Sequence, residues 1–182
     1  MKLQIALVLF GFCSLVSLTG CVATAPVVTQ TRSEPTVRDD VYSPSIVVSG
    51  EKTVIRDGSS IKGHAVTASI HKKTKIETYY LRYEIFYFDS TWRFYESAYL
   101  PGGDKLDRVD MQRQVGSCSG GYVRSCSFTE VLLFSLTESA LQRVLDDGAV
   151  DFKIGGQRDS TLVRVYKADV EALKAEVAKQ RG

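Results

Sequence analysis

Apolar and polar residues alternate along most of the chain from Ser45 onward. The period is two over about ninety positions, which places apolar side chains on one face of an extended strand; a helix would show a period of 3.6. Gly, Pro and Ser residues interrupt the alternation at short intervals. The strands that this pattern predicts cover residues 46–48, 52–56, 65–71, 76–88, 92–100, 106–115 and 122–134.

Two helices and two further strands are predicted near the end of the chain. Residues 135–138 form a capping-box pattern, and Gly148 stands where that helix would end. Residues 150–154 and 161–165 alternate again, and residues 168–180 carry an apolar stripe at helical spacing. The whole pattern indicates a mainly β fold: an antiparallel β-sandwich, immunoglobulin-like in general architecture, with a short helix and a C-terminal helix.

The beginning of the chain has a different pattern. Lys2 is followed by residues 3–18, which are mostly apolar and carry no charge, and then by small residues before Cys21. A basic start, an apolar core and small residues at a boundary are typical of a secretory signal peptide. The apolar run is shorter than the roughly 18–20 residues that a membrane-spanning helix needs.

The ending Leu18-Thr19-Gly20-Cys21 resembles the lipobox of bacterial lipoproteins, the site of signal peptidase II. In that family the signal is removed before the cysteine, whose thiol then carries a diacylglycerol. The resemblance implies a signal peptide over residues 1–20 and lipidation of Cys21; an ordinary secretory signal is the alternative. In Gram-negative bacteria, lipoproteins without Asp after the cysteine usually reach the outer membrane. Since Val22 follows here, the resemblance implies an outer-membrane anchor and a protein that faces the periplasm.

Residues 21–44 are predicted to be the lipidated cysteine and a flexible tether, and residues 45–182 a single β-sandwich domain. Three of the four prolines lie in the tether, among Thr, Ser and Val residues that bury too little apolar area to repay ordering. The formal net charge of the full chain is only +2. A charge this small gives no electrostatic case for binding nucleic acid.

Cys118 and Cys126 remain once Cys13 is assigned to the signal and Cys21 to the anchor. In an exported protein such a pair predicts a disulfide bond. The alternative is a nucleophile at Cys118, because residues 116–120 loosely match the G-x-[SC]-x-G motif. That motif requires a helix after the nucleophile, whereas the sequence here predicts a strand, so the disulfide is favoured.

The titratable residues predict no catalytic or metal centre. His64 and His71 would point to opposite faces of one strand, and no further His or free Cys could complete a zinc site. Glu84 and Glu96 suggest the carboxylate pair of a glycosidase. The expected strand pairing turns Glu84 outward and Glu96 inward near Tyr83, so the two carboxylates would not face each other. We therefore expect no enzyme activity, no cofactor and no bound metal.

An aromatic and basic surface is the best candidate for a partner-binding site. If residues 76–88 and 92–100 form a hairpin, burying both apolar rows places Tyr87 opposite Trp92. The outer face of this hairpin would then carry residues typical of binding hot spots. These residues are Tyr80, Arg82, Phe86, Arg93, Tyr95 and Tyr99. The alternative is a face covered by the C-terminal helix, or a strand surface rich in Tyr because of its β-propensity.

These features predict a non-enzymatic lipoprotein that binds or braces another component of the cell envelope, such as a protein complex. Its partners would be the membrane, through the lipid anchor, and an envelope protein. The alternative function is an envelope domain that binds or hydrolyses a cell-wall sugar or a lipid. A deep cleft with converging carboxylates would favour the alternative, whereas a flat aromatic patch would favour the first.

Overall fold

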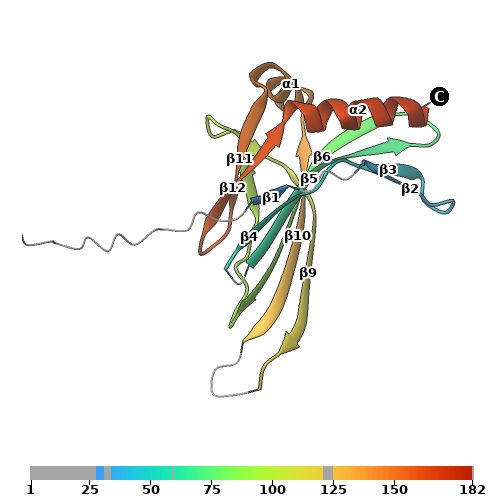
Figure 1. Cartoon of the computed structure of the whole chain (residues 1–182). Coiled ribbons are helices and arrows are strands. Elements are labelled where there is room, and N and C mark those ends of the chain that lie inside the picture. Colours follow the sequence, from blue (N-terminus) through green and yellow to red (C-terminus); the bar gives the residue numbers. More distant parts are fainter. Residues whose placement is uncertain (1–27, 31–33, 59, 121–124, 182) are drawn as a thin grey trace, which may run out of the picture.

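The computed structural model describes residues 28–30, 34–58, 60–120 and 125–181 of the chain. The fold is mainly β, with two antiparallel sheets, one short helix and one C-terminal helix (Figure 1). The predicted fold class is therefore confirmed. The signal peptide and Cys21 lie outside the described residues.

The larger sheet has eight strands. Their bounds are β1 (Val28–Gln30), β2 (Thr36–Asp39), β3 (Ser45–Ser49), β4 (Thr53–Asp57), β5 (Ser60–His71), β6 (Glu77–Asp89), β9 (Arg108–Cys118) and β10 (Cys126–Leu136). The main path runs β1-β4-β5-β6-β10-β9, while β3 pairs with the second half of β5 and β2 pairs with β3. Because β4 pairs with the first half of β5, that long strand supports two different neighbours along one edge.

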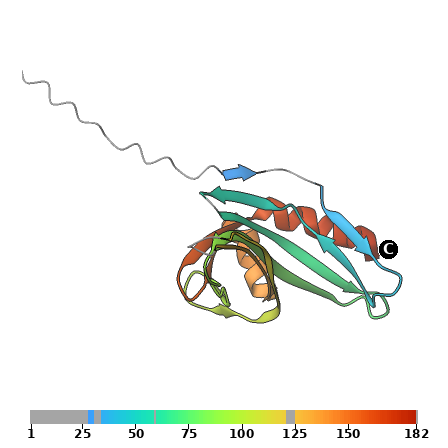
Figure 2. The same cartoon turned by 90° about the horizontal axis from the view of Figure 1, so that it is seen from below.

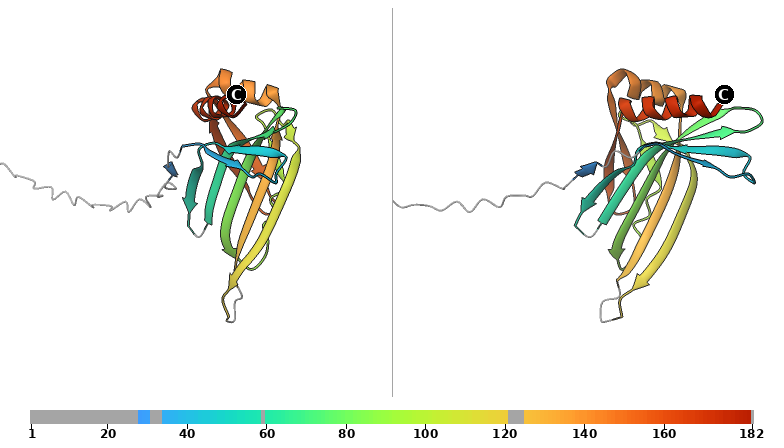
Figure 3. Two further views of the ribbon diagram at one scale, coloured as in Figure 1. Left: turned by 90° about the vertical axis from the view of Figure 1, so that its right-hand side faces the viewer. Right: turned by 45° about the vertical axis from the view of Figure 1, so that its right-hand side comes forward.

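The smaller sheet has four strands in the order β12-β11-β7-β8. Their bounds are β7 (Ser97–Tyr99), β8 (Lys105–Leu106), β11 (Ala149–Gly155) and β12 (Ser160–Tyr166). Helix α1 (Glu138–Asp147) leads from β10 into β11, and helix α2 (Lys167–Arg181) follows β12 directly. Figure 3 shows both helices at one end of the molecule and the β9–β10 hairpin extending toward the other.

The core lies on the inner face of the larger sheet, between it and the smaller sheet and α2. Alternate residues of β6 are buried there: Tyr79, Leu81, Tyr83, Ile85 and Tyr87. The apolar stripe of α2, made of Val170, Leu173 and Val177, is also buried, as its spacing predicts. Figure 2 shows α2 lying across the larger sheet, against which it packs at β3 and β5.

Helix α1 begins two residues later than the capping-box pattern predicts. Thr137 is the N-cap, and its hydroxyl accepts a hydrogen bond from the backbone N–H of Ala140 at 3.2 Å. Ser135 remains in strand β10 instead, because its backbone N–H donates to the carbonyl of Asp107. The helix ends at Gly148, whose φ of 78° is a conformation that glycine adopts without strain.

The predicted hairpin of residues 76–88 and 92–100 is wrong. Strand β6 pairs with β5 and β10, and the residues before β7 form no strand. Strand β7 is short and pairs with β8 and β11 in the other sheet. The physical reason is that the backbone N–H groups of Phe94 and Tyr95 bind the side chain of Glu130 rather than a neighbouring strand.

The predicted tether also contains strands. Within residues 21–44, β1 pairs with β4, and β2 pairs with β3. Composition predicted flexibility because these residues offer little apolar area. Strand pairing here is carried by backbone hydrogen bonds at two free edges of the sheet, which the composition does not reveal.

The predicted disulfide between Cys118 and Cys126 is confirmed; the two residues lie opposite each other on β9 and β10. Replacing both with serine should lower the free energy of unfolding by about 2.5 kcal/mol, because the open loop regains conformational entropy in the unfolded chain. Urea unfolding of the variant and of the reduced parent should give the same shift. Free thiols at both positions in untreated envelope protein would restore the alternative of a reactive Cys118.

Candidate functional site

The six predicted partner-binding residues do not share one surface. Tyr80, Arg82 and Phe86 lie on the outer face of β6, the face turned away from α2 and the smaller sheet. The other three belong elsewhere, because the hairpin that would have placed them there does not form. Tyr95 is fully buried, Tyr99 lies in the smaller sheet, and Arg93 packs over the inward-facing ring of Tyr87.

A groove of about 610 Å³ crosses this outer face and is lined by residues of six strands. Tyr80 and Arg82 of β6 lie within it, together with Arg38 of β2, Val47 of β3 and Leu133 of β10. Strands β2 and β3 supply one side because β3 pairs with β5 at the level where β6 presents Tyr80. The groove therefore combines two arginines, one tyrosine and one carboxylate, Asp110, with aliphatic and hydroxyl side chains.

Salt bridges and hydrogen bonds hold the polar groups beside the groove. One guanidinium nitrogen of Arg82 lies 3.2 Å from a carboxylate oxygen of Glu84, which also binds Lys52 Nζ at 3.0 Å. The hydroxyl of Tyr80 lies 2.8 Å from that of Thr78. The Glu84 carboxylate is shared with Lys52, so Arg82 retains donors for a bound anion.

On the inner face, Glu130 of β10 is a fully buried carboxylate with four hydrogen bonds. Oε1 accepts from the hydroxyl of Tyr87 at 2.7 Å and from the backbone N–H of Phe94 at 3.2 Å. Oε2 accepts from the backbone N–H of Tyr95 at 3.2 Å and from Arg113 Nε at 3.1 Å. Both carboxylate oxygens are occupied by two donors each, so Glu130 holds the loop before β7 in place.

A buried carboxylate is present, but it is Glu130 and not Glu96, the residue that the sequence pattern predicted. Glu96, predicted to point inward near Tyr83, has a side chain that is 48% exposed and pairs with Arg113 at 3.3 Å. The signal for Glu130 was present in the sequence, because it stands at a buried position in the alternating row of Phe128, Leu132 and Phe134. Glu84 faces outward, away from the core.

Arg93 and Tyr87 form a second contact around this loop. The Arg93 guanidinium lies 4.5 Å from the centre of the Tyr87 ring and pairs with Asp89 and Asp159, each at 3.5 Å. Burial, followed by the hydrogen bond that Tyr87 donates to Glu130, raises the pKa of the Tyr87 phenol. Arg93 is therefore held by the fold rather than offered to a partner.

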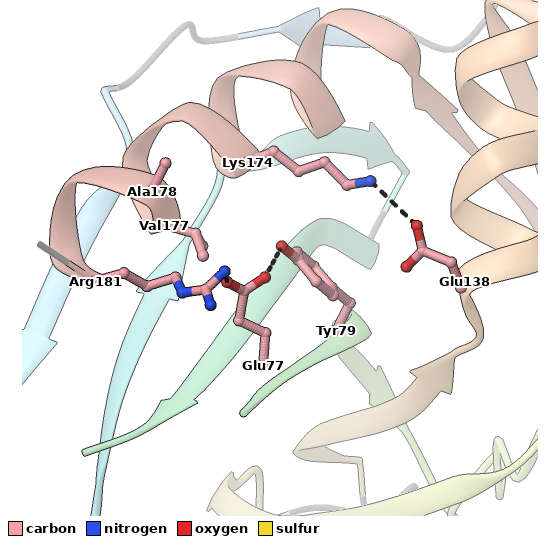
Figure 4. A pocket seen from close by; sticks show the side chains of 7 residues that line it. All are labelled: Glu77, Tyr79, Glu138, Lys174, Val177, Ala178 and Arg181. Carbon is pink, nitrogen blue, oxygen red and sulfur yellow. Dashed lines mark hydrogen bonds and ion pairs between the residues drawn. The ribbon is translucent and has the colours of Figure 1, made fainter. Parts of the chain in front are cut away.

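A pocket of about 500 Å³ lies between the end of α2, the start of β6 and α1 (Figure 4). Its charges are paired: Arg181 binds Glu77 at 2.8 Å, and Lys174 binds Glu138 at 3.5 Å. Tyr79 donates to Glu77 at 2.7 Å, and burial with this hydrogen bond raises the pKa of the phenol. Because the charged side chains of this pocket pair with one another, they hold α2 against β6 and α1 and leave no reactive group.

The two histidines have structural roles. His64 is buried, with Nε2 2.8 Å from the carbonyl oxygen of Arg164, and burial lowers the pKa of its imidazole. His71 Nδ1 accepts from the backbone N–H of Thr74 within a turn. Among the described residues, no three His, Cys, Asp or Glu side chains are placed to hold a metal ion.

Comparisons with protein-family models, with curated proteins and with solved structures found no match for this chain. In the part of the chain that the structure describes, neither helix is long and apolar enough to cross a membrane.

Proposed function

We propose that this protein is a lipoprotein of the bacterial outer membrane, facing the periplasm, that binds an envelope protein and has no enzymatic activity. The lipobox-like ending at Cys21 supports the anchor. The disulfide between Cys118 and Cys126 supports export, because disulfides persist in oxidising compartments such as the periplasm.

The outer-face groove is the observation that carries the binding role. Its length across six strands suits an extended segment of a protein partner. Arg38 and Arg82 favour carboxylates on that segment, while Tyr80 and Leu133 offer apolar contact between them. We therefore infer that the partner presents an acidic, extended segment.

The alternative, hydrolysis of a cell-wall sugar or a lipid, requires two carboxylates that converge on a substrate. Asp110 is the carboxylate that lines this groove, and its oxygens accept from the Met111 backbone and, at 3.5 Å, from the Gln112 side chain. Glu84 is bound by Lys52 and Arg82. Among the described residues the groove therefore has one lining carboxylate, Asp110, and no second carboxylate that converges on it, which favours binding over hydrolysis.

Truncating Tyr80 and Arg82 together to alanine should weaken association with the partner by about 2 kcal/mol or more, as hot-spot residues do. Stability should change by about 1 kcal/mol or less, because both side chains are partly exposed and Glu84 keeps Lys52 as its partner. The measurement is photo-crosslinking in intact membranes from a probe at Ser69, which lines the groove. The expected adduct forms in the parent and is lost in the variant.

A matched control is alanine at Tyr166 and Arg158, an exposed tyrosine and arginine of the smaller sheet and the turn beside it. This control should keep the adduct. Equal adduct yields from the parent and from the Tyr80 and Arg82 variant would refute the groove as the binding site.

A further inference from the structure

Two turns lie side by side at one end of the larger sheet. The turn between β2 and β3 is next to the turn between β5 and β6, because Ser45 pairs with His71 in adjacent strands. Figure 1 shows both turns at the right-hand edge of the molecule, near the C-terminus. The surface that they share forms no part of the groove or of the pocket at α2.

This surface exposes apolar residues to an unusual degree. Tyr42 is 94% exposed, Val41 83% and Ile76 62%. Lys73 and Lys75 are exposed beside them on the second turn, and among the described residues neither forms an ion pair. We call these five residues the twin-turn tip. Single exposed apolar residues are common on protein surfaces, whereas three on two adjacent turns are a feature that calls for an explanation.

Hydrogen bonds between the turns keep the tip in place. The backbone N–H of Lys72 donates to the Pro44 carbonyl at 2.9 Å, and Lys72 Nζ binds the Asp40 carbonyl at 2.6 Å and the Asp39 carboxylate at 2.8 Å. The Asp40 carboxylate accepts from the backbone N–H of Tyr42 at 2.9 Å. Of the acidic residues beside the tip, Asp39 pairs with Lys72 and Glu77 pairs with Arg181, while Asp40 keeps its negative charge. Lys73 and Lys75 outnumber that one charge and remain open to a ligand.

We propose that the twin-turn tip contacts the anionic surface of a lipid bilayer. Lysines near an anionic leaflet bind its phosphate groups, and Tyr with aliphatic residues occupies the boundary between headgroups and acyl chains. The tip protrudes and lines none of the cavities found among the described residues, which fits a broad, deformable surface better than a peptide. This contact rests on the proposed lipid anchor, which keeps the domain beside the membrane.

The test uses the full protein isolated from membranes and reconstituted into phosphatidylcholine vesicles with or without phosphatidylglycerol. An environment-sensitive fluorophore is attached through Val41→Cys, and a second preparation carries it through Val115→Cys on β9, an apolar residue that is 49% exposed. The fluorophore at position 41 should shift to the blue and be quenched by spin-labelled lipid only with phosphatidylglycerol. The fluorophore at position 115 should stay solvent-like in both.

Charge reversal at Lys73 and Lys75 should lower the ratio of inserted to free tip by at least about 25-fold, since each lysine near an anionic surface changes that ratio about fivefold. Charge reversal at Lys105 and Lys153, two exposed lysines of the smaller sheet, changes the net charge equally and should have no effect. A solvent-like fluorophore at position 41 on vesicle-bound protein would overturn the proposed contact of the tip with lipid. So would quenching that depends only on the surface density of the protein, because the tip would then contact a second copy of the chain. Mass measurement of the acyl groups tests the anchor separately, and an unacylated parent that also fails to bind anionic vesicles refutes both.

Discussion

Replacing Glu130 with alanine should lower the free energy of unfolding by about 3–5 kcal/mol, the range typical of breaking a buried charged interaction. The carboxylate is fully buried and accepts four hydrogen bonds. Its removal leaves the Tyr87 hydroxyl and the backbone N–H groups of Phe94 and Tyr95 without their acceptor, and each buried donor without a partner costs about 1–3 kcal/mol. Urea unfolding followed by circular dichroism measures the change.

Glu96→Ala is the matched control, because Glu96 binds the same Arg113 from an exposed position and should contribute about 1 kcal/mol or less. Hydrogen exchange adds a local readout, since the amides of Phe94 and Tyr95 should exchange faster in Glu130→Ala and not in Glu96→Ala. Equal destabilisation by the two changes would contradict the role assigned to Glu130.

Changing Cys21 to serine should abolish lipid attachment and block the specific cleavage before residue 21. The loss of the lipid should be complete, because the thiol of Cys21 is the attachment point that the lipobox resemblance implies. Membrane anchoring should be lost with it, since each buried methylene of an acyl chain contributes about 0.8 kcal/mol. Metabolic labelling with a fatty-acid analogue measures it. Cys13→Ser, which alters the signal segment alone, should keep the label.

Equal labelling of the Cys21→Ser variant and the parent would refute the lipoprotein proposal. Recovery of the labelled parent in the inner-membrane fraction would refute only the proposed destination. The two outcomes separate the anchor from the sorting of the protein.

Local patterns predicted much of this fold, and long-range pairing accounts for the errors. The alternation along β6 and the helical stripe of α2 need only their own residues, and both are confirmed. The hairpin prediction was wrong because β6 already pairs with β5 on one side and β10 on the other. Neither edge of β6 is therefore open to residues 92–100. The buried carboxylate of Glu130 then gives the backbone of that segment another acceptor.

The candidate site was predictable in the same limited way. A period of two placed Tyr80, Arg82 and Phe86 together on β6, and the structure has them on its outer face. Arg38, in contrast, lies in a segment whose composition predicted a tether, and it reaches the groove only because β2 pairs with β3. The pattern of residues within one strand cannot show that a separate edge strand supplies a side chain to the groove.

The pairing of β1 with β4 sets how far the domain can move from the bilayer. If Cys21 carries the lipid, the leash from Cys21 to Val28 spans at most about 25 Å. Along β5, the distance from Lys62, beside the β4 residue that pairs with Val28, to His71 near the twin-turn tip is about 30 Å. If the sheet stood upright with the twin-turn tip on the membrane, Val28 would lie farther from the bilayer than the segment from Cys21 can reach. The domain would therefore lie tilted against the membrane. A partner could then reach the groove only close to the membrane surface.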